Sequence, residues 1–77
     1  MQKLFEIVPR RGAWDVVHNH VGFRRYPEKR EAIRVALLLG RMQLRLADEA
    51  EVVLRDGSGA PRARRHYSPD GGQGLQH

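Results

Sequence analysis

The sequence predicts an α+β domain of order β-β-α-β-β, in which two hairpins form an antiparallel sheet and one long helix packs on it. Two apolar-rich runs of strand type, at 4–8 and 13–19, are joined by a Pro-Arg-Arg-Gly turn. The segment 27–47 then shows the apolar spacing of a helix, and two further strand-like runs follow it. This order is typical of a helix laid on one face of a sheet.

The first hairpin has its turn at 9–12, where Gly12 is free to adopt a positive φ. In its second strand Trp14 alternates with Asp15, which predicts that Trp14 lies in the core beneath the helix. An exposed Trp14 that stacks on a base is the alternative. Residues 21–26 either extend this strand or form a loop.

The helix is expected to begin at Pro27, because proline suits a first helical position, and to run to about Ala47. Apolar residues cover more than half of its circumference, which is more than one small sheet usually buries. We therefore expect part of this surface to lie in a homodimer interface, or else to be covered by loops and the tail. The predicted interface centres on Val35, Met42 and Leu46.

The last two strands are expected at 50–56 and 60–67, on either side of a Gly-Ser-Gly turn. Pro61 makes the final strand an edge strand or one that starts late. One domain thus spans 1–67, and the Gly-rich segment 68–77 is expected to be a disordered C-terminal tail.

Composition narrows the class of protein. A chain of 77 residues without cysteine has a small core and neither a disulfide nor a thiolate metal site. No run approaches the roughly 20 apolar residues of a membrane span, and the first residues lack the apolar region of a signal peptide. We therefore expect a cytoplasmic protein without membrane association.

Short motifs follow one another in a set order along 3–67. They are Val8 and Pro9, then Gly12, Trp14 and Val16, then Glu-Ala-Ile at 31–33 with Ala36, then Glu-Val-Val-Leu at 51–54, Asp56 with Gly57, and Tyr67. In this the chain resembles a family of small prokaryotic domains of unknown function. The resemblance implies the β-β-α-β-β fold, and it implies no activity.

The arginines are the most informative feature for function. Twelve of the 14 basic residues are Arg, and at about 100° per residue four of them fall within a helix arc of roughly 60°. This helix stripe consists of Arg30, Arg34, Arg41 and Arg45. Guanidinium groups bind phosphates and carboxylates through paired donors, and a net charge of +5 attracts polyanions. A GC-rich coding sequence also produces many arginines, so composition alone does not establish binding.

Two further groups of arginines lie beside aromatic residues, as in many proteins that bind single strands. They are Arg24 and Arg25, between Phe23 and Tyr26, and Arg62, Arg64 and Arg65, close to Tyr67. The alternative for every group is a solvated surface with internal ion pairs, such as Arg34 with Glu31 or Arg64 with Glu51. The predicted function is a non-catalytic module that binds DNA or RNA, and a protein-interaction or homo-oligomeric domain is the alternative.

No residue set typical of catalysis is apparent. His18 and His20 would share one face of a strand and could hold one edge of a metal site, but no third ligand is defined. Carboxylates such as Asp15 and Glu51 are scattered, and we expect them to solubilise strand ends. We therefore expect no catalytic residues, no metal, no cofactor and no small-molecule substrate.

Overall fold

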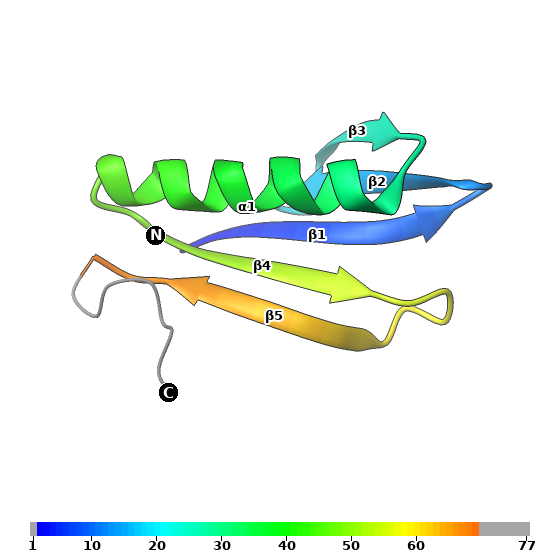
Figure 1. The fold of residues 1–77 in the computed structure, drawn as a ribbon. Coiled ribbons are helices and arrows are strands. Elements are labelled where there is room, and N and C mark those ends of the chain that lie inside the picture. Colours follow the sequence, from blue (N-terminus) through cyan, green and yellow to red (C-terminus); the bar gives the residue numbers. More distant parts are fainter. Residues whose placement is uncertain (1, 70–77) are drawn as a thin grey trace.

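The computed structural model describes residues 2–69, which form five strands and one helix in the order β-β-β-α-β-β (Figure 1). The elements are β1 (Gln2–Arg10), β2 (Ala13–His18), β3 (Gly22–Tyr26), α1 (Lys29–Arg45), β4 (Glu49–Arg55) and β5 (Pro61–Tyr67). The α+β class, the helix and four predicted strands are confirmed. β3 is a fifth strand at 22–26, where the sequence predicted either an extension of the preceding strand or a loop. The segment 70–77, most of the predicted disordered tail, lies outside the described residues.

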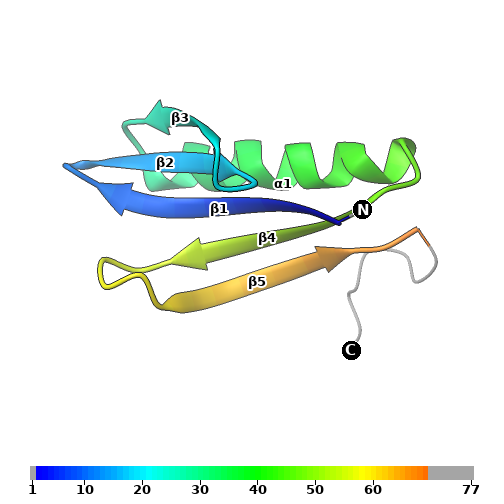
Figure 2. The same ribbon diagram turned by 180° about the vertical axis from the view of Figure 1, so that it is seen from behind.

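The strands form one sheet in the order β3-β2-β1-β4-β5. β1 and β4 pair in parallel, whereas the other three pairs are antiparallel (Figures 1 and 2). The sheet is therefore mixed, and the prediction of a purely antiparallel sheet is wrong. The additional strand is the reason: β3 runs parallel to β1, the helix brings the chain back, and β4 then enters in the same direction as both.

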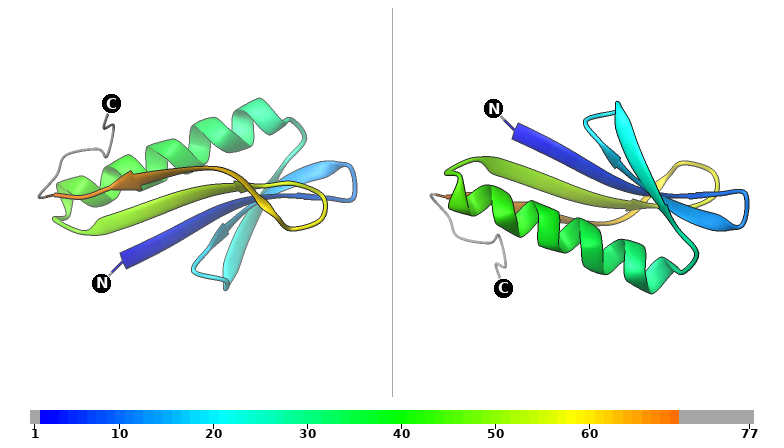
Figure 3. Two further views of the ribbon diagram at one scale, coloured as in Figure 1. Left: turned by 90° about the horizontal axis from the view of Figure 1, so that it is seen from below. Right: turned by 90° about the horizontal axis from the view of Figure 1, so that it is seen from above.

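The helix lies over one face of the sheet, mainly over β1 and β4 (Figures 1 and 3). The residues that it turns toward the sheet are small, since Ala32, Ala36 and Gly40 are its buried positions. A Cβ atom on Gly40 would lie 2.9 Å from both Tyr67 Cε2 and Val52 Cγ2. These small residues allow the helix backbone to approach the sheet closely.

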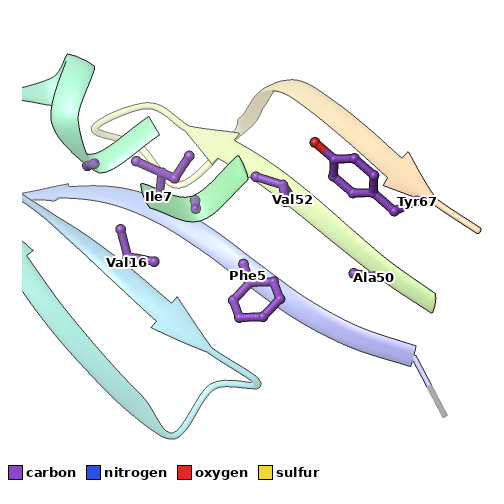
Figure 4. Close-up of a cluster of buried hydrophobic side chains, with 8 residues drawn as sticks. Phe5, Ile7, Val16, Ala50, Val52 and Tyr67 are labelled. Carbon is purple, nitrogen blue, oxygen red and sulfur yellow. The ribbon is translucent and has the colours of Figure 1, made fainter. Parts of the chain in front are cut away.

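The core is the layer between the helix and the sheet (Figure 4). From the sheet it contains Phe5, Ile7, Val16, Ala50, Val52 and Tyr67. Trp14 is only partly buried and packs at the edge of this layer, where Lys29 Nζ lies 5.3 Å from its ring centroid. Trp14 therefore belongs to the rim of the core rather than to its centre.

The helix is shorter than predicted at both ends. It begins at Lys29 rather than at Pro27, because an extended N-cap residue follows the proline. At the other end Ala47 adopts a φ of 59°, and the Asp48 N–H donates to the Gln43 carbonyl at 2.9 Å. This is the hydrogen-bond pattern of a Schellman C-cap, in which the residue with positive φ is usually glycine.

Tight turns with positive φ connect the first three strands. Gly12 has a φ of 77°, as its place in the predicted turn required. In the next turn Asn19 and His20 have φ values of 52° and 64°. The Asn19 N–H donates to the Leu4 carbonyl at 2.8 Å, and Asn19 Oδ1 accepts from the Leu4 N–H at 2.7 Å. Asn19 thereby fastens this turn to β1.

Candidate nucleic-acid interface

The arginines divide between the two faces of the sheet. The face that carries no helix is called here the open face. Residues in register point to the same side of a sheet, so the pairings of β1 with β2 and β4 place three carboxylates on this face. They are Glu6, Asp15 and Glu51.

Asp15 is fully buried, which corrects the expectation that this carboxylate solubilises a strand end. Arg25 Nε donates to Asp15 Oδ1 at 2.9 Å, and Arg10 Nη1 lies 3.5 Å from Asp15 Oδ2. The hydrogen bond to Asp15, together with the attraction between the charges, raises the pKa of the Arg25 guanidinium. Arg25 is therefore held in a structural ion pair.

The other two carboxylates of the open face are paired in the same way. Arg55 Nε donates to Glu6 Oε2 at 2.8 Å, and His20 Nδ1 lies 3.3 Å from Glu6 Oε1. Arg64 Nη1 donates to Glu51 Oε2 at 3.1 Å. The pair of Arg64 with Glu51 is the internal ion pair that the sequence analysis gave as the alternative to nucleic-acid binding by Arg64. Acidic side chains thus balance most of the positive charge on the open face.

Asp56 organises the turn between β4 and β5. It accepts hydrogen bonds from Ser58 Oγ at 2.7 Å, from Ser58 N at 2.9 Å and from Ala60 N at 3.0 Å. These donors, with Ser58 contributing most, lower the pKa of the Asp56 carboxyl. Arg62 Nη1 lies 3.9 Å from Asp56 Oδ2. Arg62 therefore joins Arg25 and Arg64 as predicted binding residues that face a carboxylate.

The helix stripe is exposed along its whole length. All four arginines lie on the side of α1 away from the buried residues Ala32, Ala36 and Gly40. Arg34 Nη2 is 3.9 Å from Glu31 Oε2, a separation at which an exposed pair contributes little. Within residues 2–69, Arg30, Arg41 and Arg45 form no ion pair. The stripe is therefore a row of available guanidinium groups.

Two arginines of the edge strands face the same side as the helix. Arg24 on β3 pairs in register with Val16, and Arg65 on β5 pairs with Val52. Both partners are core residues beneath the helix, so Arg24 and Arg65 flank α1 on its two sides. Both are exposed, and neither forms an ion pair with another described residue.

The nine predicted arginines thus fall into two sets. Six lie on the helix side, and three pair with acids on the open face or at the β4–β5 turn. The set on the helix side comprises Arg24, Arg30, Arg34, Arg41, Arg45 and Arg65. Since the open face is nearly neutralised, the positive excess of the chain is concentrated on the helix side.

A groove of about 520 Å³ runs between the helix and β3. Its floor is formed by Phe5 and Val16, and the helix contributes Val35, Leu39 and Gln43. From the strand side His18, Gly22, Arg24 and Tyr26 line it. The groove is therefore mainly apolar, with an arginine on its outer wall.

His18 and His20 lie on opposite faces of the sheet, which corrects the expectation that they share one. The imidazole of His18 stacks on Phe5 on the helix side, with ring centroids 4.7 Å apart and planes inclined by 19°. His20 lies in the turn, where positive φ redirects the chain, and contacts Glu6 of the open face. The described His, Asp and Glu residues form no group of three that could hold a metal ion.

Two of the three residues of the predicted dimer interface are exposed. Met42 and Leu46 are 46% and 69% exposed, whereas Val35 is half-buried against the groove. Leu38, at 48% exposure, lies on the same line of the helix, since it is four residues before Met42. This apolar strip of Leu38, Met42 and Leu46 separates the helix stripe from the groove.

Sequence reasoning missed both the groove and the partners of the buried acids. The partners could have been found from the sequence, because Glu6 and Asp15 each interrupt an apolar strand. A carboxylate at such a position is buried and needs a cationic partner. For the groove the signal was weaker, because β3 has no apolar alternation that would have placed Gly22 and Arg24 beside His18.

Family models, curated proteins and solved structures gave no match to this chain. The resemblance to the small prokaryotic family therefore stays a prediction. Within residues 2–69, the helix is neither long nor apolar enough to cross a membrane.

Proposed function

We propose that this protein is a non-catalytic module that binds nucleic acid through the helix stripe. The observation that carries the proposal is the division of the arginines: those of the open face neutralise acids, whereas those of the helix side have few acids near them. A straight helix holds the four guanidinium groups in a fixed row, at about 1.5 Å of rise per residue. Such a row suits the phosphates of a polyanion.

Binding of this kind is mainly electrostatic and only weakly dependent on sequence, because phosphate contacts carry no base information. If all four arginines contact phosphates of a duplex, the logarithm of affinity should fall with the logarithm of salt concentration with a slope of about −3.6. Arg24 and Arg65 would add to the attraction from either side of the helix. Arg25, Arg62 and Arg64 would contribute less, because each already faces a carboxylate.

The test is a fluorescence-anisotropy titration of labelled duplex DNA and of single-stranded RNA at about 50 and about 200 mM salt. The variant is Arg41→Gln/Arg45→Gln, in which glutamine preserves helix propensity. The control is Arg10→Gln/Arg11→Gln, which removes the same charge at the β1–β2 turn from arginines outside the predicted binding set. We expect the first variant to reduce the salt slope by about two, and the control to change it far less.

Two results would contradict the proposal. The first is a folded wild type that binds neither nucleic acid at low salt. The second is an equal loss of affinity in both variants, since net charge rather than the helix stripe would then govern binding.

A second candidate function, homodimerisation, is favoured by the apolar strip. Three of the four exposed large hydrophobic residues in the described part of the chain lie on this one line of the helix. We propose a second copy as the occupant, packed antiparallel about a two-fold axis near Met42, so that Leu38 of one copy meets Leu46 of the other. Both helix stripes would then face the same side. Light scattering coupled to size exclusion tests this, and a monomer at high concentration would refute it.

A further inference from the structure

The groove between α1 and β3 exists because one helix cannot cover this sheet. Five strands at a spacing of about 4.8 Å extend over roughly 19 Å, whereas a helix with its side chains is about 10 Å across. Because α1 lies mainly over β1 and β4, with β3 off to one side of it (Figure 3), it covers the helix side of β3 least completely. The groove of about 520 Å³ at this place has a volume within the range of small-ligand sites.

An exposed stacking platform forms one end of the groove. Phe5 is buried at 2% exposure, and the imidazole of His18 stacks on it with centroids 4.7 Å apart. His18 itself is exposed and lines the groove. A third flat ring placed on His18 would continue this stack, and every nucleobase offers such a face.

The space beside this platform is empty. Gly22 is the register partner of His18 across β2 and β3. A Cβ atom on Gly22 would meet no heavy atom within 4 Å in the described part of the chain beyond its two chain neighbours, so none of those other described side chains fills this position. The absence of a side chain at Gly22 therefore leaves room for a planar ligand next to the imidazole.

Polar groups suited to a nucleotide lie on the two walls. Arg24, two residues beyond Gly22 on the same face of β3, is exposed and forms no ion pair with the described residues. Across the groove, Gln43 Oε1 is buried and has no hydrogen-bond partner among residues 2–69. An unpaired buried acceptor is costly, and an N–H donor on a ligand that reorients this amide would remove the cost.

We propose that this groove binds one nucleotide unit, with its base stacked on His18 and its phosphate on Arg24. The ligand is a base with its phosphate, supplied either by a single strand or by a free nucleotide. For the single strand the inference rests on the proposed function, because the helix stripe would hold the neighbouring phosphates. A duplex keeps its bases stacked and paired, so the groove should favour single strands.

The test compares single-stranded RNA with a duplex in anisotropy titrations of matched variants. His18→Asn removes the platform, and Gly22→Val fills the empty space with a residue that strands tolerate well. His20→Asn is the control, because it removes a ring two residues away on the opposite face. We expect His18→Asn to weaken single-strand binding roughly five- to hundred-fold, and Gly22→Val to weaken it as well. Duplex binding should be unchanged, and His20→Asn should resemble the wild type.

The possible results separate this inference from the proposed function. The wild type can bind both nucleic acids while His18→Asn and Gly22→Val lower neither affinity, or lower both affinities equally. The groove is then not a base site, and the proposed binding through the helix stripe is not contradicted. If the wild type binds no nucleic acid, the proposed function fails. Adenosine monophosphate is then titrated into the protein and followed by NMR, with ribose 5-phosphate, which lacks the base, as the comparison. Shifts of the His18 ring and Gly22 amide signals with the nucleotide alone would then support a free-nucleotide site. No shifts would overturn the inference.

Discussion

At the scale of single residues, two positions of the helix and its C-terminal cap limit the stability of the fold, one through close contacts and one through its backbone angle. Gly40 sits where the helix backbone meets Tyr67 and Val52, so only a hydrogen fits there. Ala47 lies just beyond the helix in a left-handed conformation that an L side chain adopts at a cost. Both positions therefore favour glycine.

Gly40→Ala should destabilise the protein although alanine is the better helix former. The added Cβ would lie 2.9 Å from Val52 Cγ2 and Tyr67 Cε2, and overpacking of this kind costs about 1–3 kcal/mol. The gain in helix propensity is about 1 kcal/mol, so the net effect is a loss of stability. Urea denaturation measures it. In a Val52→Ala background the same substitution should cost less, and an unchanged cost in that background would contradict the steric explanation.

Ala47→Gly should stabilise the protein by about 1 kcal/mol. Glycine adopts the φ of 59° without steric penalty, and the Schellman hydrogen bond from Asp48 to Gln43 is retained. Ala13→Gly, in a strand position without positive φ, is the matched control and should lower stability. Chemical denaturation of both variants measures the effect. A loss of stability in Ala47→Gly would contradict the argument that the left-handed conformation of Ala47 is strained.

At the scale of elements, hydrogen bonds to one carboxylate hold the β4–β5 turn. Asp56 accepts from Ser58 and Ala60, and Arg55 Nη1 donates to the Gly59 carbonyl at 3.1 Å on the other side of the turn. β5 is exposed at every position except Tyr67, so this turn contributes much of what keeps that edge strand in register.

The stability of this turn should depend on pH in the acid range. The folded pKa of Asp56 lies below its ordinary value of 3.8, so the ionised carboxylate stabilises the fold above that value. The contribution is lost as the pH falls from 3.8 through the folded pKa. Asp56→Asn should therefore show a smaller loss of stability between pH 5 and acid than the wild type. Thermal melts across this range measure it, and parallel profiles for the two proteins would exclude Asp56 as the source.

At the scale of the whole molecule, sequence patterns predict the elements better than their arrangement. The apolar spacing identified α1, and strand-like runs separated by turn residues identified β1, β2, β4 and β5. β3 was left open because Gly-Phe-Arg-Arg-Tyr has no apolar alternation, and its strand structure depends on pairing with β2. Because this strand was missing from the prediction, β4 was expected to run antiparallel to β1, whereas the two strands are parallel. For the site, the helix stripe followed from periodicity alone, whereas the pairing of Arg25 with Asp15 required the register of strands distant in space.

The division of charge between the two faces makes a prediction about the stability of the folded protein. A ligand that binds only the folded state raises its stability, by about 2.7 kcal/mol at a free concentration of 100 times Kd. For a domain of this size that corresponds to a rise in Tm of roughly 10 °C or more. Single-stranded RNA should raise the Tm of the wild type and of Arg10→Gln/Arg11→Gln, and should raise that of Arg41→Gln/Arg45→Gln much less. Differential scanning fluorimetry at low salt measures these shifts. Equal shifts in all three proteins would mean that the polyanion is held outside the helix stripe, because the folded state would then gain as much without it.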